Sequence, residues 1–244
     1  MSRFYCPPEK VREGAIYLDG DEAHHIYKVM RLRPDDEVVV FDGIKGYKGI
    51  ITSAAPKSVV VRIIKAGRTR PESELNVSIA IGLPKGKKMD LIVQKCTELG
   101  VKEIIPMKTE RSVVLPDNKD EGKKIKRWLE IARGASKQSG RIKIPAISGI
   151  TVFKEVAKLS ESFSAVFIGC VSGADCAFKK ALKDKKPKRK DGVLFLVGPE
   201  GGFSKSEIEL AKKSKISPVY LGERVLRTET AAIYVMSVIN FFYD

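Results

Sequence analysis

Residues 192–204 read GVLFLVGPEGGFS, and residues 219–231 read VYLGERVLRTETA. Each stretch begins as an apolar run of strand length, continues through a glycine-containing turn and leads into a sequence that favours a helix. Strand, turn and helix repeated in this order are typical of an α/β fold with a largely parallel sheet. We therefore expect both turns at the carboxyl ends of strands, where ligands bind in such folds.

After each turn, the sequence contains residues that are typical of the first turn of a helix. Ser204 and Glu207 have the spacing of a capping box, and Thr228 can cap the helix after the second turn. That last helix, residues 228–242, is apolar on nearly every side and too short to span a bilayer. We expect it to be buried, in part at the contact of a symmetric homodimer.

The first turn is a candidate binding site for a ligand without phosphate groups. It lacks the G-x-x-x-x-G-K-[ST] spacing of a phosphate-binding loop, and the chain contains no G-x-G-x-x-G. Nucleoside triphosphates and dinucleotides are therefore disfavoured. Glycines in the turn would instead allow backbone donors and acceptors to approach a ligand closely.

The sequence divides into two parts near residue 72. Residues 37–66 contain three short β-branched runs, which predict a small β-barrel, and residues 22–31 before them have helical spacing. From residue 75 onward strands and helices alternate. We expect two domains, residues 1–72 and residues 73–244.

Charge and composition point to a polyanionic partner. The 244 residues include 45 Lys and Arg against 30 Asp and Glu, which gives a net charge of +15, and the pI is about 9.6. Nucleic acid is the first candidate partner. The 4 cysteines form no C-x-x-C pair, so we expect no metal site, and the absence of a long apolar run predicts a cytoplasmic protein without a membrane span.

Several motifs together resemble the RsmE family of ribosomal RNA uridine N3-methyltransferases, within the SPOUT superfamily. The resemblance covers essentially the whole chain. It is carried by H25-I-Y-K-V-M-R followed by FDG, K85-G-K-K-M-D, Q94-K-C-T-E-L-G-V, I105-P-M-K-T-E-R-S, Trp128, G198-P-E-G-G-F-S and L221-G-E-R-V-L-R-T-E-T-A.

The resemblance implies a PUA-like RNA-binding barrel followed by a SPOUT domain with a deep trefoil knot. It also implies a homodimer that uses S-adenosylmethionine, without a metal, to methylate a uridine of 16S rRNA in the small (30S) ribosomal subunit. Carried over by position, the cofactor-binding residues are Leu196, Val197, Gly198, Pro199, Glu200, Gly201, Gly202, Leu221, Gly222, Val225, Leu226, Arg227, Thr228, Thr230 and Ala231.

The chemistry of such a reaction suggests catalytic candidates. A uracil ring nitrogen must lose its proton to attack a methyl carbon, so we consider Glu200 and Glu229 as the base. Arg227, and then Arg111, are candidates for a cation that stabilises the uracil anion. The alternatives are turn stabilisation for Glu200, a helix-dipole contact for Glu229, and phosphate or carboxylate contacts for the arginines.

Basic residues outside the two turns are candidates for contacts with RNA. These are Arg3, Lys28, Arg31, Arg33, Lys85, Lys87, Lys88 and Arg141. Lys87 and Lys137 stand where the family often has acids, which suggests tighter and more salt-sensitive RNA binding. Two alternatives to uridine N3 methylation remain open: methylation of a ribose 2′-hydroxyl by another SPOUT enzyme, and a noncatalytic RNA-binding or ribosome-assembly factor.

Overall fold

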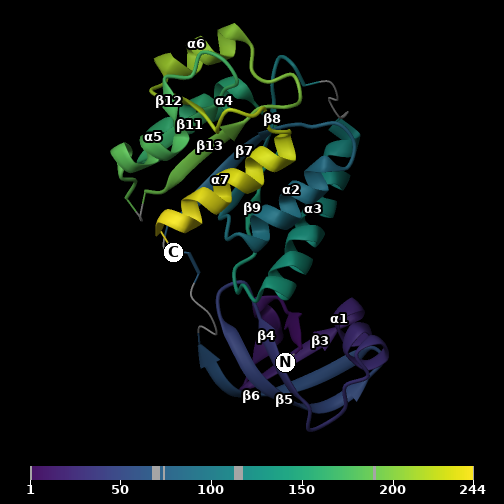
Figure 1. Cartoon of the computed structure of the whole chain (residues 1–244). Coiled ribbons are helices and arrows are strands. Elements are labelled where there is room, and N and C mark those ends of the chain that lie inside the picture. Colours follow the sequence, from purple (N-terminus) through teal and green to yellow (C-terminus); the bar gives the residue numbers. More distant parts are fainter. Residues whose placement is uncertain (1, 68–71, 74, 113–117, 189–190, 244) are drawn as a thin grey trace. The chain divides into compact units, whose positions relative to one another are not determined.

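The computed structural model describes residues 2–67, 72–73, 75–112, 118–188 and 191–243. These residues form two compact units (Figure 1), Met1–Glu72 with Ser136–Ile144 and Ser73–Ala135 with Pro145–Asp244. The first unit therefore includes a segment, Ser136–Ile144, that the predicted domain of residues 1–72 leaves out. Across the described ranges, no helix is both long enough and apolar enough to cross a membrane.

The first unit is built on a sheet with the strand order β1-β4-β5-β6-β3-β2. Among its described strands, β1 and β4 pair in parallel and the other pairs are antiparallel. Its strands are β1 (Arg3–Tyr5), β2 (Val11–Arg12), β3 (Ala15–Asp19), β4 (Glu37–Phe41), β5 (Gly46–Ala55) and β6 (Ser58–Gly67). Strand β3 buries Ile16 and Leu18 and exposes Tyr17 between them, the alternation that a one-sided sheet requires. The three β-branched runs predicted over residues 37–66 are β4, β5 and β6.

The structure is helical over most of the predicted residues 22–31, but the second part is a π-helix. A short 3-10 helix η1 (Pro8–Lys10) comes first, and then α1 (Gly20–His24) continues into a π-helix, η2 (His25–Val29). The wider π turn moves later residues off the buried face, so Val29 is 61% exposed although the helical spacing predicts an apolar stripe.

The second unit contains a sheet in which every pairing between described strands is parallel, as predicted. The strand order is β10-β8-β7-β13-β11-β14-β12, with β9 paired to β8. The strands are β7 (Val77–Gly82), β8 (Glu103–Lys108), β9 (Ala146–Ile147), β10 (Thr151–Val152), β11 (Ala165–Gly169), β12 (Cys176–Ala177), β13 (Val193–Val197) and β14 (Ser217–Tyr220). Every residue of β7 and β13 is buried, as in strands covered on both faces.

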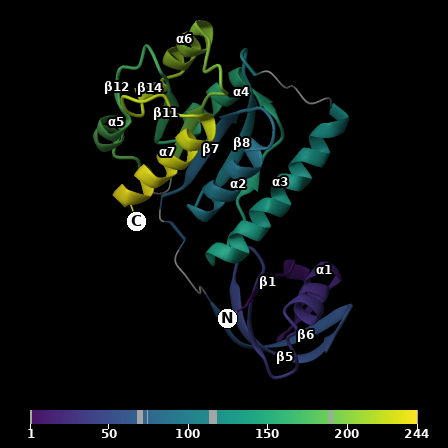
Figure 2. The same cartoon turned by 45° about the vertical axis from the view of Figure 1, so that its right-hand side comes forward.

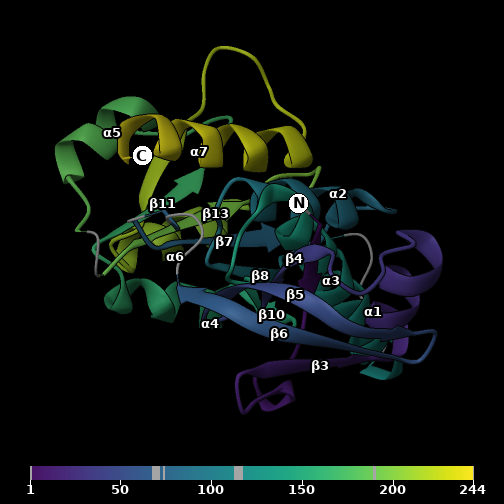
Figure 3. The same ribbon diagram turned by 90° about the horizontal axis from the view of Figure 1, so that it is seen from below.

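Helices cover both faces of this sheet. They are α2 (Lys88–Glu98), α3 (Asn118–Ser139), α4 (Phe153–Lys158), α5 (Phe178–Lys185), α6 (Lys205–Lys213) and α7 (Thr228–Tyr243), with a 3-10 helix η3 (Leu159–Ser162) after α4. Figure 3 shows α2, α5 and α7 on one side of the strands and α4 on the other, where α6 contacts it. Helices α2 and α3 lie next to each other (Figure 2) and are joined by the ion pair between Asp90 and Arg127.

The last helix is buried along one side, as predicted. Helix α7 packs against β7, β13 and α2, and it buries Ala232, Val235 and Ile239 completely. Its first residue, Thr228, follows directly from the loop after β14. The fold therefore brings the start of α7 to the edge of the sheet where β13 ends.

Candidate functional site

The two glycine-containing turns follow β13 and β14, which lie on either side of β11 in the sheet. The hydroxyl of Thr228 donates a hydrogen bond to the carbonyl oxygen of Gly198 over 3.0 Å. Thr228 is only 4% exposed, so this bond is shielded from water. The two turns therefore meet at the carboxyl edge of the sheet, the usual ligand-binding edge of an open α/β fold.

Close backbone contacts define the shape of the first turn. The N–H of Gly202 donates to the carbonyl of Pro199 over 2.8 Å, and Gly202 has a φ of +67°, which favours glycine. A side chain at Gly82, at the end of β7, would place its Cβ 2.5 Å from Cδ of Pro199. The turn thus lies directly against the end of the neighbouring strand.

Glu200 in this turn forms hydrogen bonds with the turn after β7. Its Oε1 accepts hydrogen bonds from the backbone N–H of Lys85 at 3.2 Å and from Nζ of Lys88 at 2.5 Å. Partial burial raises the pKa of Glu200, but the hydrogen bonds from Lys88 and from backbone N–H groups lower it more, so the net pKa is below its ordinary value. A carboxylate held in this way is a weak proton acceptor, and Glu200 instead ties the first turn to the turn after β7.

Arg111 is held against the same turn from the end of β8. Its Nη1 donates to the carbonyl oxygen of Gly201 over 2.9 Å. A Cβ on Gly201 would lie 3.2 Å from Cβ of Arg111, so a larger residue at position 201 would displace that arginine. Arg111 is therefore a residue that positions the turn, although its exposed side chain remains near the site.

The predicted capping box is present at the start of α6. The Oγ of Ser204 accepts from the N–H of Glu207, and Oε2 of Glu207 accepts from the N–H of Ser204. The other carboxylate oxygen of Glu207 accepts from the backbone N–H of Glu110 over 3.0 Å. This second contact cannot be predicted from the sequence, because Glu110 and Glu207 are far apart in the chain and only the spacing within the capping box is a local signal.

The second turn is more exposed than the first. Leu221 and Leu226 are half-buried, whereas the residues from Gly222 to Val225 are exposed. The guanidinium of Arg227 is exposed, and among the described residues it has no hydrogen-bond or ion-pair partner. Arg227 therefore remains available for a ligand.

Glu229 differs from Glu200 in its surroundings. It is half-buried in the first turn of α7, and its Oε2 is shielded from solvent without a hydrogen-bond partner in the described part of the chain. A buried carboxylate oxygen without a donor is costly unless a ligand supplies one. Of the two predicted bases, Glu229 is the one with a carboxylate oxygen that lacks a partner among the described residues.

The remaining predicted cofactor residues supply mainly backbone. Leu196 and Val197 are buried within β13 and Ala231 is buried in α7, while Thr230 is exposed on that helix. The side chains of Leu196, Val197 and Ala231 therefore pack in the core, and that of Thr230 faces solvent. Any ligand contact from Leu196 and Val197 has to come from main-chain groups.

Three of the predicted RNA contacts gather around the π-helix of the first unit. Lys28, Arg31 and Arg33 are all exposed. The guanidinium of Arg33 lies 4.7 Å from the ring centroid of Tyr27, and Nζ of Lys28 lies 5.8 Å from it. Arg31 has a φ of +54° at the end of this segment. We call Tyr27, Lys28, Arg31 and Arg33 the Tyr27 cluster.

Two other predicted RNA contacts have structural roles. Nε and Nη2 of Arg141 donate to Oε2 of Glu72 at 3.1 and 2.9 Å, and Arg141 is only 10% exposed in its side chain. Nη2 of Arg3 donates to the carbonyl oxygen of Arg141 over 3.0 Å, and its guanidinium lies over the ring of Phe41. Both side chains are therefore engaged within the first unit, and RNA contacts from Arg3 and Arg141 stay a prediction.

The other predicted basic residues fall into two groups. Lys85 and Lys87 are exposed in the turn after β7, while Lys88 forms the ion pair with Glu200 described above. Lys137 forms an ion pair with Glu22 within the first unit, with its side chain 23% exposed. Lys137 therefore has an ion-pair partner, whereas the side chain of Lys87 has none among the described residues.

Comparison with known proteins assigns the family. The model of an RNA methyltransferase domain matches residues 71–240, and that of an RNA methyltransferase PUA domain matches residues 18–64. The chain therefore belongs to the RNA methyltransferases that carry a PUA domain. Among its relatives is Ribosomal RNA small subunit methyltransferase E of Bacillus subtilis, which is 34% identical, with 99% of this chain and 96% of that protein covered.

Solved structures agree with this assignment. Ribosomal RNA small subunit methyltransferase E from Neisseria gonorrhoeae, bound to S-adenosyl methionine, matches with a TM-score of 0.89 and 30% identity, over 100% of this chain and 98% of that one. A putative methyltransferase from Legionella pneumophila, in complex with the same cofactor, matches with a TM-score of 0.87 and 32% identity, over 98% and 97%. These findings confirm the predicted family, enzyme class and α/β fold with a PUA domain.

Proposed function

We propose that this enzyme transfers a methyl group from S-adenosylmethionine to N3 of a uridine in 16S rRNA of the small ribosomal subunit. The observation that carries the proposal is the hydrogen bond between Thr228 and Gly198, which joins two backbone-rich turns at the ligand-binding edge of the sheet. Full-length relatives named for methylation of small-subunit rRNA, and similar structures that contain S-adenosylmethionine, support it.

The two turns suit a cofactor without phosphates. We assign the cofactor to the predicted segments 196–202 and 221–231, whose buried members offer main-chain groups. The unpartnered Oε2 of Glu229 is an acceptor among these segments that still needs a donor. When bound, S-adenosylmethionine supplies a methyl group on a positively charged sulfur.

The chain's own residues have to position the uracil and remove its N3 proton. Glu229 is the proposed proton acceptor, because Glu200 is held in its ion pair with Lys88. The free guanidinium of Arg227 is the proposed cation for the uracil anion, and Arg111 holds the first turn in place. Most of the rate would then come from alignment of the reacting atoms.

The first unit is the proposed RNA-binding module. The Tyr27 cluster combines three exposed cations with an aromatic ring, which suits phosphates and an unpaired base. Lys85 and Lys87 in the second unit are further proposed phosphate contacts. The first unit is thus assigned to RNA binding and the second unit to methyl transfer.

We further propose a cytoplasmic homodimer with a knotted cofactor domain. The crossover from β13 through α6 to β14 passes β11, and α7 then returns to β7 and β13, a path compatible with a trefoil knot. Large apolar side chains are exposed on this unit, among them Val171 (75%), Val225 (74%) and Phe241 (85%). Such side chains favour burial against a second copy of the chain.

The proposed reaction is tested by methyl transfer to unmethylated small ribosomal subunits and to free 16S rRNA. The methyl donor carries an isotopic label, and mass spectrometry of digested RNA locates the labelled atom. We expect label on N3 of a uridine. Label on a ribose 2′-oxygen would indicate the other SPOUT reaction, and RNA binding without any transfer would indicate a noncatalytic factor.

A further inference from the structure

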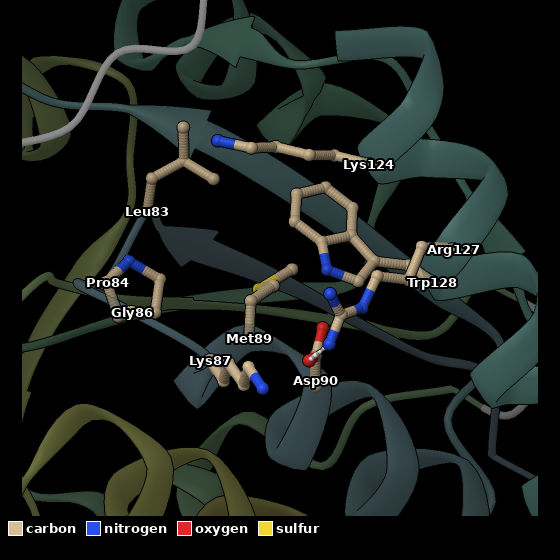
Figure 4. A pocket seen from close by; sticks show the side chains of 9 residues that line it. All are labelled: Leu83, Pro84, Gly86, Lys87, Met89, Asp90, Lys124, Arg127 and Trp128. Carbon is tan, nitrogen blue, oxygen red and sulfur yellow. Dashed lines mark hydrogen bonds and ion pairs between the residues drawn. The ribbon is translucent and has the colours of Figure 1, made fainter. Parts of the chain in front are cut away.

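A separate cavity lies in the second unit between the turn after β7, the start of α2 and helix α3 (Figure 4). Its volume is about 120 Å³, well above the roughly 10–15 Å³ that one water molecule needs on this measure. The cavity is therefore large enough to receive part of an organic ligand. None of the proposed cofactor or catalytic residues lines it.

One part of the cavity wall is apolar and is formed by Leu83, Pro84, Met89 and Trp128. Figure 4 shows the indole of Trp128 facing Leu83 and Pro84 across the opening, with Met89 between them. Trp128 is 5% exposed, and Leu83 and Met89 are similarly buried. Among the residues that the structure describes, the indole N–H has no hydrogen-bond acceptor. Such walls fit a flat ring that carries polar atoms at its edge.

Positive charge surrounds this apolar interior. Lys87 is exposed and Lys124 is half-buried, and neither has an ion-pair partner in the described ranges. The ammonium group of Lys124 extends across the opening toward Leu83 (Figure 4). Arg127 also lines the cavity, but its charge is compensated by Asp90. Two uncompensated cations thus remain beside the apolar walls.

The cavity and the proposed active site share one chain segment, the turn after β7. The turn that supplies Pro84 and Lys87 continues into Lys88, whose ammonium pairs with Glu200 in the first cofactor turn over 2.5 Å. The backbone N–H of Lys85 in the same turn donates to Glu200 as well. A ligand in the cavity would therefore contact the same short segment that supports the cofactor turn.

We infer that this cavity binds an unpaired nucleotide of the substrate RNA other than the one that is methylated. The base packs against the indole of Trp128, and Lys87 and Lys124 contact its phosphates. An aromatic wall beside cations is the combination by which proteins bind single-stranded RNA. The positively charged cofactor is disfavoured here by the same lysines. The inference rests on the proposed function and extends it to a second contact with the RNA.

The kinetic test compares two lysines of the same helix. Lys124 lines the cavity, whereas Lys126 is exposed and does not line it, so Lys126→Glu is the matched control for Lys124→Glu. We expect Lys124→Glu to raise the KM for unmethylated small subunits about fivefold or more, with unchanged affinity for S-adenosylmethionine. Equal KM values for the two variants would overturn the inference while leaving the methyl transfer of the wild type, and hence the proposed function, intact.

A second measurement does not depend on methyl transfer. Trp128 is the single tryptophan of the chain, so tryptophan fluorescence reports on this cavity alone. A short single-stranded oligoribonucleotide with a terminal dye is titrated, and its anisotropy measures binding in the same cuvette. We expect tryptophan fluorescence to fall as the RNA binds, and to fall less in Lys124→Glu. Bound RNA without a change in tryptophan fluorescence would overturn the inference.

Discussion

The hydroxyl of Thr228 lies 3.0 Å from the carbonyl oxygen of Gly198 and donates a hydrogen bond to it. Thr228 begins α7 and Gly198 follows β13, so this one bond joins the two turns that we assign to the cofactor. Because both turns offer mainly backbone groups, their mutual distance determines whether those groups can face one ligand.

Replacement of Thr228 by valine removes this bond at nearly constant volume. We expect the affinity for S-adenosylmethionine to fall about tenfold, because loss of a shielded hydrogen bond that leaves the carbonyl of Gly198 unpaired costs about 1–2 kcal/mol. Titration calorimetry measures the affinity. The control is Ser237→Ala, which removes a hydroxyl that donates to Ile233 within the same helix; equal losses in both variants would refute the role of Thr228.

The variants Glu229→Gln and Glu200→Gln distinguish between the two candidate bases. We expect Glu229→Gln to lower kcat about 100-fold or more, as loss of a general base does. The pKa of Glu200 is below its ordinary value, so its carboxylate is already charged throughout the neutral range and cannot produce a titration there. Glu200→Gln should therefore keep the shape of the pH profile of kcat. A larger loss of kcat in Glu200→Gln than in Glu229→Gln would contradict this assignment and indicate Glu200 as the base.

The ion pair between Glu72 and Arg141 predicts a pH-dependent stability. The carboxylate of Glu72 also accepts from the backbone N–H groups of Ile142 and Lys143, both at 3.0 Å. Burial raises the pKa of Glu72, but the charge of Arg141 and these hydrogen bonds lower it more, so the net pKa is below the ordinary 4.5. The folded state therefore gains stability from Glu72 above that value and loses it as the pH falls through the lowered pKa.

We expect Glu72→Gln to reduce the free energy of unfolding at pH 7 by about 2–3 kcal/mol, since hydrogen bonds to a charged group are stronger than neutral ones. Urea denaturation followed by circular dichroism measures this. The loss should shrink as the solution is acidified below pH 4.5. Glu155→Gln, which affects only an exposed pair with Lys158, is the control. A loss that is independent of pH would contradict the role of the Glu72 charge.

The Tyr27 cluster predicts where RNA affinity resides. Arg31→Ala should weaken binding of 16S rRNA and reduce the slope of log affinity against log salt by about 1, the effect of one lost phosphate contact. Affinity for S-adenosylmethionine should not change. Lys57→Ala, at an exposed position in the turn between β5 and β6, is the matched control. An equal change of slope in both variants would place the phosphate contact elsewhere.

The proposed homodimer predicts a role for the exposed end of α7. Phe241 is 85% exposed, and Phe241→Asp would place a charge at any apolar contact made there. We expect light scattering to show a dimer for the wild type and a shift toward monomer for this variant. Lys215→Asp, after α6, is a charge-changing control on a polar residue. A wild-type monomer at micromolar concentration would contradict the proposal.

Local patterns account for the parts that were predicted correctly. The capping box at Ser204 and Glu207 depends on residues three apart, and the buried strand β13 is visible as an uninterrupted apolar run. The order of strand, turn and helix then places each turn at the same edge of a parallel sheet. None of these signals requires knowledge of contacts between distant segments.

Distant contacts account for the parts that were not predicted. The sequence around Arg141 predicts an exposed cation. Its ion pair with Glu72 could not be predicted, because Glu72 lies 69 residues away in the chain. The contact that reduces Glu200 to a structural role comes from Lys88, 112 residues away. The π-helix after α1 cannot be predicted from a periodicity of 3.6 residues per turn, because each of its hydrogen bonds spans one residue more than in an α-helix.

We expect the two turns joined by Thr228 and Gly198 to hold S-adenosylmethionine. A crystal structure of the wild-type protein with this compound would show where it binds. Density for the cofactor between segments 198–202 and 221–231, with the Thr228–Gly198 bond retained, is the predicted result. Density at any other place, or two turns separated by solvent with the compound absent from both, would contradict the account.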